Sequence, residues 1–195
     1  MQTPKTLSVA SALALALLFG PLAPAATESY TVDTVHSSVM FKVKHLGTSN
    51  FYGRFNEISG KLAFDGGDPA KSSVSLEVKV ESVNTGNEAR EKHLKSPDFF
   101  SAKEFPTISF KSKSVKKGGQ GIYEVEGDFT LHGTTKPIKV KAERTGSGKN
   151  PRSGKDLAGF ETTFTIKRSD YGMKNMIPML GDEVQITVSL EAEKA

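Results

Sequence analysis

Much of the chain from Ser37 onward is built from short segments in which apolar and polar residues alternate. Successive side chains of a β-strand point to opposite faces, so each segment has one apolar face and one charged face. The clearest examples are residues 75–81, 138–143 and 183–190. Strands of this kind are best accommodated when the sheet curls around its own apolar face. The pattern therefore predicts an all-β barrel.

The alternation places strands at nine positions. Phe55 falls out of phase with Ile58 and Leu62, which predicts a bend near residues 56–57. Residues 145–157 are rich in Gly and Lys and are expected to form a long loop. The expected strands cover residues 30–33, 37–46, 52–64, 73–83, 107–115, 122–131, 138–144, 160–166 and 183–192.

A short helical insertion is expected at about residues 85–104. Thr85 and Glu88 have the spacing of a capping box, and the helix should run to about Leu94. Pro106 disfavours helix at Phe105, so the insertion should end there.

Strand phase also identifies the side chains that should face the interior. Small inward residues (Gly60, Ser112, Ser114, Gly127 and Ala142) leave room for a guest, although a filled core would use the same pattern. His45 is also expected on the inward face, where a hydrogen bond to a backbone carbonyl would satisfy it. The residues expected to line an apolar interior tunnel are Phe41, Val43, Phe64, Phe110, Val125, Phe129, Phe164 and Ile186.

The segment at residues 169–182 contains three of the five methionines of the chain, Met173, Met176 and Met179. Methionine is flexible and fits irregular apolar shapes. We expect this segment to form either a lid over a hydrophobic ligand or a plug that closes the core.

The first residues form a separate segment. Lys5 precedes an apolar stretch from Leu7 to Leu18, and small residues follow up to Ala25. This order predicts a signal peptide at residues 1–25, followed by one exported domain at residues 26–195 that is soluble after cleavage. The chain has no cysteine, so the domain must depend on core packing and sheet hydrogen bonds. Its formal charge of +4 is mild, and with export it argues against nucleic acid as a partner.

Catalytic and metal-binding patterns are hard to find, and no catalytic or metal site is predicted. The four histidines are far apart, without metal-ligand spacing, and no G-x-S-x-G motif is present. Arg90 and His93 are three residues apart on the predicted helix and therefore share a face. They would receive an anionic head group if the helix covers the barrel end; the alternative is a solvated face with Arg90 in a surface ion pair.

Several longer stretches resemble the YceI-like family of bacterial periplasmic proteins. They occur in order along nearly the whole mature chain: residues 36–47, 53–55, 87–100, 105–110, 127–137 and 168–173. The resemblance implies an antiparallel, lipocalin-like barrel, for which we expect about eight strands. It also implies an apolar tunnel that holds a polyisoprenoid or another long-chain amphiphile.

Our leading hypothesis is a periplasmic carrier whose only cofactor-like group is a bound polyisoprenoid or isoprenoid-quinone-like lipid. One alternative is an enzyme that acts on a hydrophobic substrate with His45 or His93 as acid/base. Another is an accessory subunit that passes lipid or quinone to a membrane redox partner. The sequence leaves open whether the barrel forms a homodimer.

Overall fold

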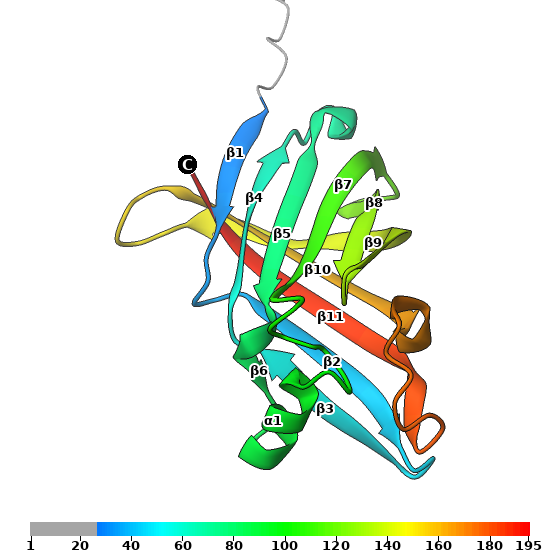
Figure 1. Cartoon of the computed structure of the whole chain (residues 1–195). Helices are drawn as coiled ribbons and strands as arrows, with labels where there is room; N and C mark the ends of the chain where they lie inside the picture. Colours follow the sequence, from blue (N-terminus) through cyan, green and yellow to red (C-terminus); the bar gives the residue numbers. More distant parts are fainter. Residues whose placement is uncertain (1–26) are drawn as a thin grey trace, which may run out of the picture.

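The computed structural model describes residues 27–195, so the predicted signal peptide lies outside the described residues. The strands form one antiparallel sheet that closes on itself through a pairing of β1 with β11 (Figure 1). This confirms the expected antiparallel barrel of about eight strands. The closed ring contains, in order, β1 (Glu28–Val32), β4 (Ile58–Phe64), β5 (Ser73–Lys79), β7 (Thr107–Lys117), β8 (Ile122–Leu131), β9 (Thr134–Lys149), β10 (Asp156–Lys167) and β11 (Leu180–Lys194).

Three further strands extend the wall of the barrel on one side of β11. They are β2 (Ser38–His45), β3 (Ser49–Phe55) and β6 (Val83–Asn84), paired in the order β11-β2-β3-β6. Each continues or precedes a ring strand after a short break, so the chain forms three bent strands (β1 with β2, β3 with β4, and β5 with β6). The break between β3 and β4 lies at residues 56–57, as predicted, and it lets both Phe55 and Ile58 be buried.

The wall of the barrel is open between β6 and β7, which do not pair with each other. β6 pairs with β3, whereas β7 pairs with β5 and β8. The helix α1 (Glu88–Lys95) and the turns that follow it connect β6 to β7 (Figure 1). Leu94 and Phe100 of this connection pack against the core, and Phe99 is buried. The insertion therefore covers the core with apolar side chains between β6 and β7, where the sheet is interrupted.

The helix begins differently from the predicted capping box. Asn87 is the N-cap, and its side chain accepts a hydrogen bond from the Arg90 backbone N–H at 2.9 Å. The carboxylate that reaches back belongs to Glu91, which accepts from the backbone N–H of Thr85 at 2.6 Å. The predicted Thr85–Glu88 pair was wrong because the cap lies two residues later.

Two inward assignments were also wrong. His45 is exposed, as is the neighbouring Lys44, because the end of β2 runs beyond the interior of the barrel and both of its faces meet solvent. A bulge between Ser112 and Ser114 shifts the phase of β7, so Val115 is buried and Ser114 lies opposite the surface residue Glu126.

The expected loop at residues 145–157 is mostly strand. β9 runs to Lys149 and β10 begins at Asp156, with Gly146 opposite Gly159. Three 3₁₀ turns complete the described chain: η1 (Pro69–Lys71), η2 (Val80–Ser82) and η3 (Arg168–Tyr171). None of the helices within residues 27–195 has the length and apolar character needed to cross a bilayer.

Candidate functional site

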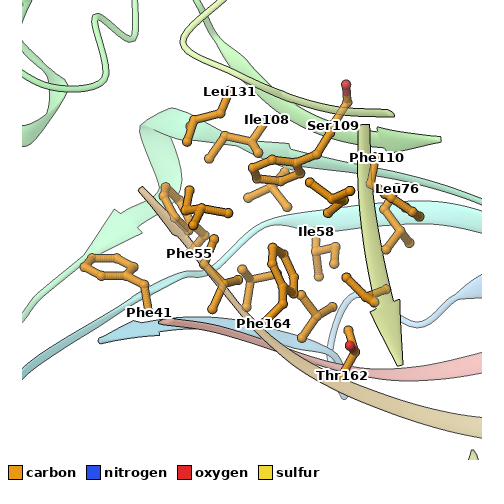
Figure 2. Close-up of a pocket in the computed structure, with 18 of the residues that line it drawn as sticks. Phe41, Phe55, Ile58, Leu76, Ile108, Ser109, Phe110, Leu131, Thr162 and Phe164 are labelled. Atoms are coloured by element: carbon orange, nitrogen blue, oxygen red, sulfur yellow. The ribbon is translucent and has the colours of Figure 1, made fainter. Parts of the chain in front are cut away.

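An apolar cavity occupies the interior of the barrel. Its volume is about 250 Å³, and side chains from every strand except β1 and β6 line it, together with residues of α1. Figure 2 shows side chains of several strands converging on this space, among them Phe55, Phe110 and Phe164. The charged residues in the lining are Arg90, Glu161 and Arg168. The site is therefore a place for an apolar guest.

The structure brings the predicted tunnel residues together. All eight line the cavity: Phe41, Val43, Phe64, Phe110, Val125, Phe129, Phe164 and Ile186. Their role in binding a ligand stays a prediction. Sequence reasoning missed other lining residues, including Phe51, Leu94 and Phe100. Phe51 has the phase of Phe55 and could have been found, but Leu94 and Phe100 lie outside the strands and give no such signal.

Two glycines let aromatic rings lie flat against the barrel wall. A Cβ atom on Gly53 would overlap the ring of Phe41, its partner across β2 and β3. A Cβ atom on Gly127 would lie 2.6 Å from Cζ of Phe110. Both rings therefore occupy space that the side chain of any residue other than glycine at positions 53 and 127 would fill. The centre of the barrel stays open.

Arg90 lies at one end of the cavity. Its Nε donates to the Thr85 hydroxyl at 3.0 Å, and Nη2 donates to the Thr85 carbonyl at 2.7 Å. Its guanidinium carbon lies 4.3 Å from the centre of the Phe51 ring, which also lines the cavity. These contacts fix an exposed positive charge beside an apolar opening.

His93 does not join Arg90 at the cavity. Its Nε2 lies 2.9 Å from Oδ2 of Asp98, and its ring packs edge-on against Phe99. His93 is exposed and absent from the lining, although Phe99 lines the cavity, so its head-group role stays a prediction. His45 is absent from the lining as well.

The three methionines of the predicted lid occupy different positions. Met173 is buried and lines the cavity, whereas Met176 and Met179 are exposed and do not. A plug made of all three was therefore wrong, and a lid over a ligand stays a prediction. The chain turns outward after Lys174, so only Met173 reaches the interior.

Arg168 is a lining residue that sequence reasoning missed. It is buried, and its guanidinium donates to three backbone carbonyls, those of Met173, Leu180 and Gly181, at 2.8–2.9 Å. Burial lowers the pKa of this guanidinium, and the negative charge of Asp182 opposes that shift. Because arginine keeps its charge in proteins, the cavity has a fixed positive charge in its wall. The guanidinium is already bonded to Met173 and to the first two residues of β11.

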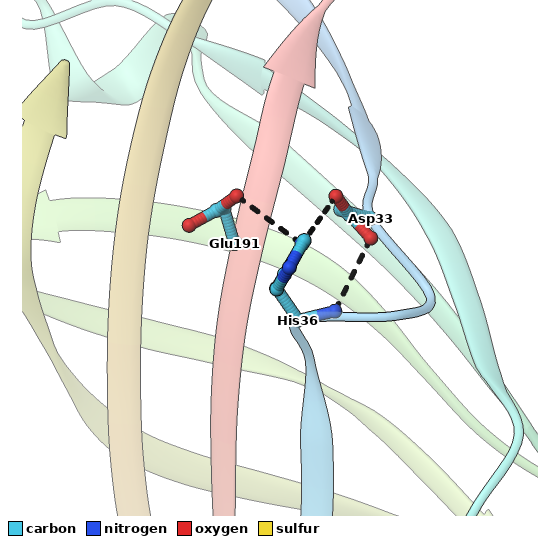
Figure 3. A group of neighbouring side chains, drawn as sticks. All are labelled: Asp33, His36 and Glu191. Carbon is cyan, nitrogen blue, oxygen red and sulfur yellow. Dashed lines mark hydrogen bonds and ion pairs between the residues drawn. The ribbon is translucent and has the colours of Figure 1, made fainter. Parts of the chain in front are cut away.

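A group of potential metal ligands lies outside the cavity lining (Figure 3). Nδ1 of His36 is 2.9 Å from Oδ2 of Asp33 and 3.7 Å from Oε1 of Glu191. The hydrogen bond between the side chains of His36 and Asp33 lowers the pKa of Asp33 and raises the pKa of His36. Asp33 also accepts hydrogen bonds from the backbone N–H groups of Val35 and His36. We interpret the group as an ion-paired turn. It holds the break between β1 and β2 (residues 33–37) against β11.

Comparison with known proteins gives consistent results. The model of the YceI-like domain matches residues 30–192. A UPF0312 protein of Pseudomonas aeruginosa is 38% identical over 187 residues, which cover 96% of each chain. The crystal structure of Burkholderia cenocepacia BcnA superposes with a TM-score of 0.75 at 25% identity, covering 82% of this chain and 98% of that one.

A further similarity concerns the fold alone. A domain of Saccharophagus degradans, described as polyisoprenoid binding, superposes with a TM-score of 0.67. The match covers 86% of this chain and 99% of that domain, at 17% identity.

Proposed function

The chain belongs to the YceI-like domain family, and from this premise we propose that it binds a polyisoprenoid or similar long-chain amphiphilic lipid inside its barrel. The observation that supports the proposal most strongly is the apolar cavity, whose lining runs from Ala142 near one end of the barrel to Phe51 and Leu180 at the other. The name of the Saccharophagus degradans domain points to the same ligand class.

The shape of the cavity favours a chain over a compact ligand. Its volume of about 250 Å³ is slightly below the roughly 300–1,000 Å³ of common small-molecule sites, although its lining spans the barrel. The space is therefore narrow for its length. Each methylene group that leaves water contributes about 0.8 kcal/mol, so a long chain binds with few polar contacts.

The polar end of such a lipid would lie near Arg90. Arginine offers several donors in one plane and suits phosphate or carboxylate oxygens. An isoprenoid quinone also has a long apolar chain and a polar end, so it fits the same cavity. Transfer of such a quinone to a membrane redox partner stays a prediction. The role of a periplasmic carrier depends on the predicted signal peptide and is part of this proposal.

The enzymatic alternative loses its proposed acid/base groups. Neither His45 nor His93 belongs to the cavity lining, so neither is placed to act on a substrate held there.

Native mass spectrometry of gently purified protein tests the proposal. We expect a bound lipid, and rebinding of a polyprenyl lipid after its removal. Val140 lines the cavity, and Val140→Phe adds a ring to the bore that displaces several methylene groups; uptake should fall about tenfold or more.

The matched control is Lys141→Phe, which adds the same ring to the outer face of the same strand and should leave uptake unchanged. Repeated recovery of wild-type protein that neither contains nor takes up lipid would sink the proposal.

A further inference from the structure

Two chain segments meet at one end of the barrel. The turn between β2 and β3 (residues 46–48) lies beside the segment between η3 and β11 (residues 172–179) (Figure 1). The backbone N–H of Leu46 donates to the carbonyl of Met179 at 2.7 Å. We call the surface formed by Leu46, Met176, Ile177 and Met179 the apolar tip.

The side chains of the apolar tip are unusually exposed. Leu46 is 58% exposed, Met179 52%, Ile177 39% and Met176 38%, and these are four of the eight exposed large apolar residues in the described chain. Leu46 and Met176 also have φ angles of 50° and 61°. Large side chains rarely adopt this left-handed conformation, which costs free energy. The backbone thus holds apolar residues toward solvent at an energetic cost.

The charge around the apolar tip is of one sign. Residues 42–52 and 172–181 contain Lys42, Lys44 and Lys174 and no Asp or Glu. Within residues 27–195 none of these three lysines forms an ion pair. The nearest carboxylates along the chain are Asp170, Asp182 and Glu183. Asp170 lies 3.7 Å from Nζ of Lys136, and Asp182 accepts from Ser169. Elsewhere in the described chain several lysines pair with acids on a neighbouring strand, as Lys113 does with Asp128 and Lys139 with Glu126, so this cationic rim is local.

The same end of the barrel holds one end of the cavity. Val43, Phe51 and Leu180 line the cavity, and each is next in the chain to an exposed residue at this end of the barrel: Lys44, Tyr52 and Met179. Arg90 contacts Phe51 there. A ligand at this end of the cavity is therefore close to whatever covers the apolar tip.

We propose that the apolar tip docks on a bilayer surface that contains anionic phospholipid, so that a lipid chain passes between membrane and cavity without crossing water. The proposal rests on the function proposed above. Exposed apolar side chains insert among acyl chains, and lysines beside them are attracted by anionic head groups. Charge complementarity is the reason for choosing a membrane over a protein partner.

Co-sedimentation of the purified protein with vesicles tests this. Vesicles of phosphatidylethanolamine and phosphatidylglycerol should bind the protein, and vesicles of phosphatidylcholine should bind it more weakly. The double variant Leu46→Asn with Met179→Ser should weaken binding by about tenfold or more, because it removes two inserting side chains. Asparagine tolerates the left-handed conformation, so the turn should survive. Val35→Ser is the control, since it removes an exposed apolar residue away from the tip.

A second pair of residues tests the charge. Each lysine near an anionic surface contributes about 1 kcal/mol, so Lys44→Gln with Lys174→Gln should weaken binding about 30-fold. Lys117→Gln removes an exposed lysine at the end of β7 and should change little.

Lipid uptake from detergent solution separates this inference from the proposed function. Tip variants that lose vesicle binding but still take up lipid support docking. Wild-type protein that binds vesicles through the tip but takes up no lipid refutes the cavity proposal and leaves docking standing. The inference is overturned if wild-type protein ignores anionic vesicles, if the tip variants bind as well as wild type, or if the tip instead mediates a dimer that the variants dissociate.

Discussion

At the scale of single residues, the open interior depends on where ring atoms are allowed to lie. Gly53 and Gly127 remove side chains from the inner wall, and the rings of Phe41 and Phe110 fill the vacated space. The aromatic residues are thus part of the wall, and the axis stays free. Without these glycines the same phenylalanines would have to point farther into the cavity.

Replacing one of these glycines should narrow the cavity without unfolding the protein. In Gly53→Ala the new methyl group overlaps the Phe41 ring, which is the flexible part of the contact and must turn toward the interior. We expect lipid affinity to fall about tenfold, in line with the cost of overpacking. Displacement of a fluorescent long-chain fatty acid measures the change.

Gly148→Ala is the matched control, because a methyl group there meets no atom within 4 Å. If Gly53→Ala binds the probe as tightly as Gly148→Ala does, Phe41 does not limit the cavity.

Strand phase is a local property, and for that reason it identified Phe41, Phe110, Phe129 and Phe164 as inward residues. It failed where the outcome depends on distant structure. His45 keeps the phase of Val43, but β2 runs past the interior before His45 is reached. Arg168 offers no apolar pattern, and its burial depends on carbonyls contributed by residues up to 13 positions away.

At the scale of elements, the segment between η3 and β11 is shaped by one side chain. Of the three carbonyls bound by Arg168, that of Met173 lies at the start of this segment, and those of Leu180 and Gly181 lie directly after it, at the start of β11. Replacing Arg168 with alanine leaves them without their donor in a buried place. The free energy of unfolding should fall by about 3 kcal/mol, since a bond to a charged group contributes about 1.5–3 kcal/mol.

Urea denaturation measures this loss, with Arg152→Ala as control because Arg152 is exposed in the turn between β9 and β10. A loss below about 0.5 kcal/mol, as is usual for surface sites, would contradict the anchoring role of Arg168.

Element boundaries show where sequence patterns are informative. The bend at residues 56–57 was predictable because Phe55 and Ile58 are out of phase. The strand ends at Lys149 and Asp156 were not, because backbone pairing there involves Gly146 and Gly159, which have no side-chain pattern. The exposed positions of Met176 and Met179 were unpredictable for a related reason: a methionine-rich segment fits a core as well as a surface.

At the scale of the whole molecule, the barrel combines a closed ring with a wall that is open between β6 and β7. The ring is closed by the antiparallel pairing of β1 with β11, which leaves no free edge there. The opening is filled by the connection that contains α1, including Arg90 and Leu94 of the cavity lining. The cavity is thus enclosed mainly by strands and bounded at one end by a helix.

A crystal structure of the protein loaded with a polyprenyl phosphate tests the central claim most directly. We predict one elongated ligand inside the barrel, with its chain between Phe110, Phe129 and Phe164 and its phosphate within hydrogen-bond reach of Arg90. An interior filled by repacked side chains, with the lipid absent or bound on the outer surface, would contradict the claim.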